Sequence, residues 1–238
     1  MAVNVKRPST FQQYKTLLMK DIRQEFHTKE MLTSMGIYAF LVLVVFGAAL
    51  AQIGNSFDIL QMSGGLFWTL IVFTSLLGLN RSFSHEKEHG CLEGILLVPL
   101  DRSVVFLAKA TSNLLFLMVV EIIALPLFYF FFLTTTTPAD SFWMIVPPLF
   151  AGTVGIAGIG TLLSTITINT RGKDVMLAVL FIPLIYPLLF ACVSATTVAI
   201  VGSEVFVDIY YPALLLAAGY DLVMLLLSWV LYDFVISA

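Results

Sequence analysis

Ionisable side chains are scarce in this chain, and many of them gather in one stretch, FSHEKEHGCLEGILLVPLDR, at residues 83–102. His85 and His89 lie four residues apart there, with Glu86 and Glu88 between them. Residues four apart share one face of a helix, so imidazole and carboxylate groups at this spacing can in principle hold a metal ion. The interpretation that we favour is that these side chains are solvated or contact another protein, and we expect no metal site.

Two further acids, Glu121 and Asp221, stand near the middle of long apolar runs. If such runs cross a membrane, an Asp at the helix centre opposes insertion of the helix by about 3 kcal/mol, and each Leu, Phe or Val favours insertion by roughly 0.5 kcal/mol. Both acids should therefore face the protein interior. Each is either a protonated carboxyl that a neighbouring helix satisfies, or part of a polar patch in a translocation path or a regulatory contact. Our hypothesis is that Glu121 lines an interior cavity.

The composition indicates which elements position these residues. Of the 238 residues, 59% are hydrophobic and 11% are charged, whereas a soluble domain has about 45 to 50% and about 25%. Continuous apolar runs exclude a transmembrane β-barrel, whose strands alternate in polarity. We predict an all-α polytopic membrane protein with six transmembrane helices, because six runs have the length of about 20 residues that crosses a bilayer: residues 32–53, 59–79, 104–133, 142–168, 175–197 and 212–232.

The basic residues lie on one side of these six runs. All 12 Lys and Arg residues fall before the first run, around the loop after the second, or in the loop after the fourth. The positive-inside rule then places both termini and residues 83–102 in the cytoplasm. Because the basic residues are dispersed along one membrane face, the net charge of -3 gives no sign of nucleic-acid binding. The lipid bilayer is the expected partner of the apolar surface.

We divide the chain into an N-terminal segment, residues 1–31, and a single six-helix membrane domain, residues 32–238. In residues 10–32 the apolar side chains recur every three or four positions, and the lysines and arginines lie off that stripe. This pattern predicts an amphipathic helix along the cytoplasmic interface, with Ser9 or Thr10 as its N-cap. The helix is either a simple membrane anchor or an elbow that transmits motion to the first span.

The charged stretch continues into a second amphipathic segment. Leu92, Ile95 and Leu96 fall on one helical face, and Gly90 and Gly94 leave a strip where another backbone can approach closely. Pro99 then forces a break, because proline lacks an N–H and clashes with the preceding turn. We predict a short cytoplasmic helix at about residues 84–98 that docks a partner.

This segment carries a family resemblance. The run EKEHGCLEGILLVPL at residues 86–100, followed by Ala108-Lys109 at the start of the third span, is similar to the E-x-E-x-G-x-L-E-x-L-L-x-x-P-L pattern of ABC-2 type exporter permeases. Within that class the whole chain resembles the haem exporter B family of cytochrome c maturation. The likeness extends from the N-terminal helix to the Gly-rich fourth span and the Arg171-Gly172-Lys173 turn.

The resemblance implies that residues 84–98 form a coupling helix, which seats in a groove of a separate ABC ATPase subunit. It assigns the coupling role to Glu86, Glu88, Gly90, Leu92, Glu93, Gly94, Leu96 and Pro99. We expect no catalytic residue in this chain, because G-x-x-x-x-G-K-[ST] is absent and ATP must then be bound by the partner. The resemblance also implies short re-entrant helices in residues 198–211, before the sixth span.

Glycines and prolines make specific predictions for the spans. Gly152, Gly155, Gly158 and Gly160 lie inside an apolar helix with no Lys nearby, so they predict a close-packing surface rather than a nucleotide-binding loop. Two prolines of the fifth span, Pro183 and Pro187, should kink it or unwind it locally.

Haem iron takes His, Met, Cys or Tyr as axial ligands. The three histidines, at positions 27, 85 and 89, all fall on the predicted cytoplasmic side. We therefore expect haem to be a transported or handled ligand, and a haem-binding partner among the other cytochrome c maturation subunits to hold the iron.

The resemblance thus implies a permease subunit for haem export or haem release in c-type cytochrome maturation, in a bacterial-type inner membrane. Six spans are half of a transporter, so a second copy or a related permease should complete a two-fold assembly. Three alternatives stay open: an ABC-2 permease for a lipid, glycan or drug; a proton-coupled secondary transporter, which would use Glu121 and Asp221; and a purely structural assembly subunit.

Overall fold

The structure is a computed structural model, and it describes residues 9–53, 59–88, 102–133, 140–168, 170, 172–202 and 207–237. Helices are the only regular secondary structure in these residues. The helices are α1 (Thr10–Thr28), α2 (Glu30–Ile53), α3 (Ile59–Glu88), α5 (Arg102–Phe132), α6 (Asp140–Thr167), α7 (Lys173–Val201) and α8 (Val207–Ser237).

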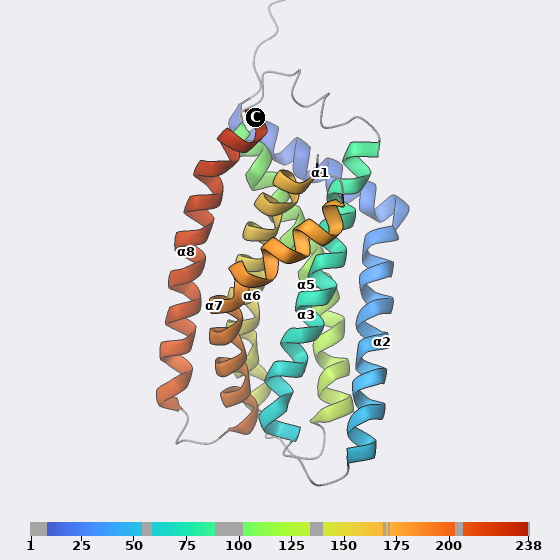
Figure 1. Ribbon diagram of the computed structural model, residues 1–238, viewed down its shortest axis with the longest axis vertical. Coiled ribbons are helices and arrows are strands. Elements are labelled where there is room, and N and C mark those ends of the chain that lie inside the picture. The colour runs from blue at the N-terminus through green and yellow to red at the C-terminus, as the bar shows by residue number, and fades with distance from the viewer. Residues whose placement is uncertain are drawn as a thin grey trace, which may run out of the picture.

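Six of the helices, α2, α3 and α5 to α8, are long and apolar enough to cross a membrane. They form an upright bundle, and α1 lies across one end of it, where the C-terminus also lies (Figure 1). The end of α3, the start of α5 and the start of α7 reach the same end of the bundle (Figure 1). The prediction of an all-α polytopic membrane protein with six spans is therefore confirmed.

Helix α1 begins where the sequence predicts. The Ser9 hydroxyl accepts a hydrogen bond from the Gln12 N–H, and the Gln12 side chain accepts one from the Ser9 N–H, which makes a complete capping box. The helix ends at Lys29, whose backbone is left-handed, with φ 54° and ψ 13°. A left-handed residue closes one helix and lets the chain start another in a new direction. Lys29 is therefore the elbow between α1 and α2.

Helix α6 is the centre of the bundle, because 78% of its apolar stretch is buried, against 17% for α2 and for α8. A Cβ at Gly152 would lie 2.0 Å from the Trp68 ring of α3, and a Cβ at Gly160 would lie 2.3 Å from Leu79. Gly155 and Gly158 face residues of α7 and α8 equally closely. The predicted close-packing surface is confirmed, and it serves three neighbouring helices rather than one.

A hydrogen bond fixes the ring that lies against Gly152. The Trp68 indole N–H donates to the Thr196 hydroxyl of α7 at 2.9 Å, and both side chains are buried. A buried indole N–H needs such a partner, because lipid supplies no acceptor. The ring therefore joins α3, α6 and α7 in a defined geometry.

Helix α7 changes direction part-way along its length (Figure 1). Pro183 and Pro187 lie inside it, and the helix continues without interruption through both. The Tyr220 hydroxyl of α8 donates to the Leu184 carbonyl in this proline-containing turn. Proline removes backbone hydrogen bonds, and a membrane helix tolerates it where a neighbour supplies replacements. The predicted kink is confirmed, without local unwinding.

The prediction of re-entrant helices before the sixth span is wrong. Helix α7 runs on to Val201, where Gly202 adopts φ 65° and its N–H bonds to the Val198 carbonyl as a C-cap. Helix α8 already starts at Val207, and it includes Pro212 in its interior. Too few residues separate the two helices for another element.

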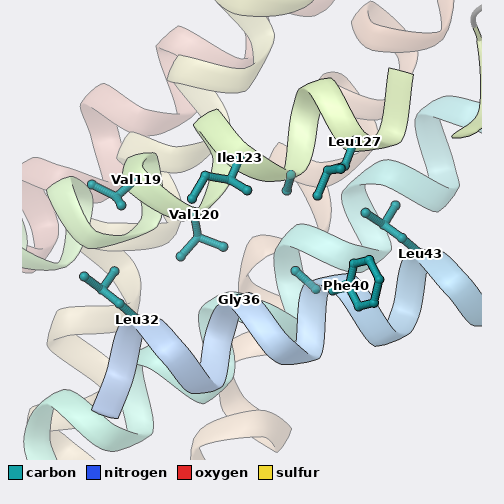
Figure 2. A pocket seen from close by; sticks show the side chains of 10 residues that line it. Leu32, Gly36, Phe40, Leu43, Val119, Val120, Ile123 and Leu127 are labelled. Atoms are coloured by element: carbon teal, nitrogen blue, oxygen red, sulfur yellow. The ribbon is translucent and has the colours of Figure 1, made fainter. Parts of the chain in front are cut away.

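The outer faces of the bundle are apolar, as a bilayer requires. Helices α2, α5, α7 and α8 all expose large hydrophobic side chains. Between α2 and α5 lies a narrow groove of about 80 Å³ (Figure 2). The groove exists because Gly36 has no side chain, and it is lined by apolar residues: Leu32, Ala39, Phe40, Leu43, Val119, Val120, Ile123, Ala124 and Leu127.

Prediction for the α6 interface. Gly152→Ala should destabilise the protein by about 1–3 kcal/mol, the usual result of overpacking, because Trp68 is held by Thr196 and cannot retreat. Gly219→Ala is the matched control, since a Cβ there would meet nothing within 4 Å. Thermal unfolding in detergent should show a lower midpoint for Gly152→Ala alone. Equal midpoints for the two variants would contradict the packing role.

Candidate functional site

The predicted coupling segment, residues 84–98, begins in the last turns of α3. The end of α3 and the start of α5 both reach the end of the bundle where α1 lies (Figure 1). Glu86 and Glu88 are in the last turn of α3, which continues without a break from the second span. The other predicted coupling residues, Gly90, Leu92, Glu93, Gly94, Leu96 and Pro99, lie outside the described residues. What the structure does describe is how the two flanking helices are anchored.

A buried ion pair anchors the start of α5 to α1. Lys109 Nζ lies 3.1 Å from Asp21 Oδ2, and each of these two side chains is only 8% exposed. The Ser112 hydroxyl lies 3.2 Å from the same Asp21 oxygen and 2.9 Å from the Lys109 carbonyl, and its one hydrogen is shared between them. Lys20 Nζ lies 3.3 Å from the other Asp21 oxygen. A buried carboxylate is tolerated only with such partners. Lys109 is two helical turns after Arg102, so this pair holds α1 close to the end of the coupling segment.

Sequence reasoning missed this cluster because it assigned only apolar residues to the buried face of α1. Tyr14, Asp21 and Glu25 face the bundle, and Phe11 and Phe26 of the predicted stripe are 73% and 66% exposed. Asp21 follows Tyr14 by seven residues, and Glu25 follows Asp21 by four. This helical spacing was the signal in the sequence that the three side chains share one face. The exposed phenylalanines are placed to enter the lipid interface.

Glu25 has a separate structural task at the elbow. Its Oε1 accepts a hydrogen bond of 2.8 Å from the Leu32 N–H, in the first turn of α2. The first N–H groups of a helix have no partner inside it, and a carboxylate there also meets the positive end of the helix dipole. Glu25 thus caps α2 from the preceding helix, and it fixes the angle of the elbow.

The elbow also contacts α3, the helix that leads into the coupling segment. Arg81 of α3 lies 3.6 Å from Glu30, the first residue of α2, in an exposed ion pair. Together with the Asp21–Lys109 pair, it joins the N-terminal helix and its elbow to both helices that flank residues 89–101.

Glu121 is buried against α6, as expected. Both of its carboxyl oxygens lie 2.8 Å from the Thr153 hydroxyl, which is also 2.7 Å from the Leu149 carbonyl. The Thr153 hydroxyl can donate its one hydrogen to either carboxyl oxygen or to the Leu149 carbonyl. A neighbouring helix therefore supplies Glu121 with a hydrogen-bond partner, and both interpretations given for Glu121 above stay predictions.

Asp221 is also buried, on α8, and it does not meet Glu121. Its Oδ1 would lie 2.1 Å from a Cβ at Gly155, and among the residues that the structure describes this oxygen has no hydrogen-bond partner. Thr153 and Gly155 are two residues apart on α6, which turns them about 200° away from each other. The two acids consequently occupy opposite faces of α6 at similar depth, and they do not form one site.

Groups that bind metals are dispersed in the described part of the chain. No cluster of three or more His, Cys, Asp and Glu residues occurs there. His27 is exposed on α1, and Cys192 is buried in the core beside Gly152. His85 lies in α3 without a described side chain, and His89 lies outside the described residues.

Six packed spans and a transverse amphipathic helix define a polytopic helical membrane protein. A family model described as "CcmB protein" matches residues 12–233. The chain therefore belongs to the CcmB family, and the match covers nearly everything from α1 to α8.

Similar proteins are known from several bacteria. The chain is 26% identical to "Heme exporter protein B" of Pseudomonas aeruginosa over 190 residues, which is 79% of this chain and 82% of that protein. It is 26% identical to the protein of the same name from Rhodobacter capsulatus, covering 65% and 69%. The Escherichia coli K12 protein of that name is 31% identical, covering 58% and 62%.

Prediction for the α1 anchor. Lys109→Ala should lower stability by about 3–5 kcal/mol, because it leaves the Asp21 carboxylate buried with too few partners. Replacing both partners, Asp21→Leu with Lys109→Met, should recover most of the loss, since no buried charge then remains. Arg81→Gln is the control, because an exposed pair contributes at most about 1 kcal/mol. Thermal unfolding of the detergent-purified variants measures all three. A double variant as unstable as Lys109→Ala would refute the explanation.

Proposed function

We propose that this chain is the permease subunit of an ABC transporter complex that handles haem during c-type cytochrome maturation. The observation that carries the proposal is the CcmB family match over residues 12–233, together with relatives named heme exporter protein B. ATP hydrolysis takes place in a separate ATPase subunit, because the sequence has no phosphate-binding loop. A second copy or a related permease completes the assembly.

The end of the bundle that carries α1 faces the cytoplasm. Helix α1 at this end contains Lys15, Lys20 and Arg23, and Lys29 follows it. The ends of α3, α5 and α7 that reach this end (Figure 1) contain Arg81, Arg102, Lys109 and Lys173, which is the asymmetry that the positive-inside rule describes. Both termini and residues 83–102 then lie on the ATPase side of the inner membrane.

The fastening of α1 supports an active role for it in coupling. When the ATPase subunits close, residues 84–98 move with them, and the spans change packing as rigid bodies. The Asp21–Lys109 and Glu30–Arg81 pairs attach α1 and its elbow to α5 and α3, on the two sides of that segment. Motion of the segment is therefore transmitted to α1 and α2. This favours the elbow role over the simple anchor.

The interior supports haem release from a partner subunit rather than haem passage through this chain. Glu121 and Asp221 are packed on opposite faces of α6, and the groove between α2 and α5 is lined by apolar side chains (Figure 2). The side chains that line this groove include no His, Met, Cys or Tyr, the ligand types that haem iron requires. Near Asp221, Cys192 is buried in the core and the Tyr220 hydroxyl is already bonded to the Leu184 carbonyl. We infer that other cytochrome c maturation subunits hold the iron, and that this chain transmits the conformational change of the ATPase subunits.

Prediction for coupling. Gly90→Trp and Glu93→Lys should each abolish co-purification of the ATPase in mild detergent and reduce haem-stained c-type cytochromes in a deletion strain. Asp208→Lys is the matched charge-reversal control, since Asp208 is exposed in the first turn of α8, at the opposite end of the bundle. Normal ATPase recovery with either coupling variant would refute docking. Normal cytochrome levels in the deletion strain itself would instead refute the haem function and favour an exporter of another substrate.

Prediction for Glu121. Thr153→Val should destabilise the protein by about 1–3 kcal/mol, because the carboxyl loses its partner, whereas the Glu121→Leu, Thr153→Val double variant should be nearly neutral. The double variant therefore separates folding from function. We expect it to fold and assemble but to lower c-type cytochrome levels, because we propose that Glu121 serves in an interior polar contact of the working cycle. Full cytochrome levels with the double variant would reduce Glu121 to a structural role.

A further inference from the structure

A groove opens to the outside of the bundle beside the elbow between α1 and α2. It has a volume of about 640 Å³, within the range of roughly 300–1,000 Å³ that is usual for ligand clefts. Its walls are formed by the end of α1, one face of α2, and the part of α3 that contains Leu77 and Arg81. The lining residues are Thr28, Lys29, Glu30, Thr33, Ser34, Ile37, Tyr38, Leu41, Leu77 and Arg81.

The lining changes from polar to apolar along α2. Lys29, Glu30 and Arg81 lie at the end beside α1, together with the hydroxyl residues Thr33 and Ser34. The far end is apolar, and its three large side chains are all exposed: Ile37, Leu41 and Leu77. At 1.5 Å per residue, the first 12 residues of α2 extend over roughly 16 Å. The groove therefore runs from the membrane interface into the hydrocarbon layer.

The polar end has a net positive charge. Its charged lining residues are Lys29, Arg81 and Glu30, which sum to plus one. The Glu30–Arg81 pair has a separation of 3.6 Å, and its two side chains are 68% and 53% exposed, so it is a weak pair. A guanidinium has five N–H donors, and one such contact leaves it able to bind an anion as well.

We propose that this groove binds one anionic glycerophospholipid from the leaflet on the α1 side. The phosphodiester lies between Lys29 and Arg81, and one acyl chain follows Ile37, Leu41 and Leu77. The net charge of plus one matches the single negative charge of the phosphodiester. A soluble anion would leave the apolar half of the groove without an occupant, whereas a lipid fills both halves from the layer that already surrounds the helices. The proposal does not depend on haem being the cargo.

The location gives the lipid a structural consequence. Among the non-glycine residues that the structure describes, only Lys29 has a positive φ, and α1 and α2 touch each other little beyond this residue. A phosphate that contacts both Lys29 and Arg81 bridges the elbow to α3. The bound lipid thus holds the elbow at the angle that Glu25 also supports.

The test is native mass spectrometry of the full chain, released from nanodiscs that contain phosphatidylglycerol or phosphatidylcholine with the same acyl chains. Lys29→Gln with Arg81→Gln should weaken phosphatidylglycerol retention about 30-fold, the value that about 1 kcal/mol per cation gives. Lys15→Gln with Arg23→Gln is the matched control, because these cations lie on a different surface of α1. This control should retain the lipid as the unmodified protein does.

A second variant tests the groove without changing its charge. Thr33 is exposed on α2, so Thr33→Trp should fold normally and block the groove, and it should also lose phosphatidylglycerol. Millimolar inorganic phosphate should not displace the lipid, because it cannot occupy the apolar half. Equal retention of phosphatidylcholine, equal losses in the control variant, an unaffected Thr33→Trp protein, or displacement by phosphate would each overturn the proposal.

Discussion

The close approach of α6 to its neighbours is the contact on which the rest of this bundle depends. Lipid is as apolar as the helices, so membrane helices associate through packing and polar contacts rather than through a hydrophobic difference. The glycines of α6 let Trp68, Leu79 and Leu225 reach its backbone. The same approach places Gly155 against Asp221 of α8, and on another face of α6 the Thr153 hydroxyl meets the Glu121 carboxyl of α5. Packing around α6 therefore also determines which groups lie next to Glu121 and Asp221 within the membrane.

The N-terminal helix is held by a different kind of interaction. It lies at the end of the bundle, where charged groups can still reach water, and ion pairs and a carboxylate cap fasten it: Asp21 to Lys109, Glu30 to Arg81, and Glu25 to the Leu32 N–H. The two ion pairs attach to the helices that lead into and out of residues 89–101, and the Glu25 bond attaches to α2. The coupling that we propose requires such connections at that place.

Membership of the CcmB family and the number of spans could be predicted from the sequence, because both rest on local patterns. Apolar runs of about 20 residues specify spans, Ser9 with Gln12 specifies the start of α1, and the run around Leu92-Glu93 and Pro99 carried the family resemblance. The re-entrant helices before the sixth span were wrong because that expectation came from the resemblance. In this chain Gly202 caps α7 late, and the membrane tolerates Pro212 inside α8.

The sequence by itself determined that the chain crosses a membrane six times, which residues are expensive to bury, and which glycines permit close contact, since these follow from composition and helical period alone. Only the tertiary structure decided which groups meet. It pairs Asp21 with Lys109, which is 88 positions later in the chain, and it brings Glu121 within hydrogen-bond distance of Thr153. It also places Asp221 on the other side of α6. The physical reason is that pairing depends on the rotation and depth of each helix, and these are set by packing against neighbours that no local pattern specifies.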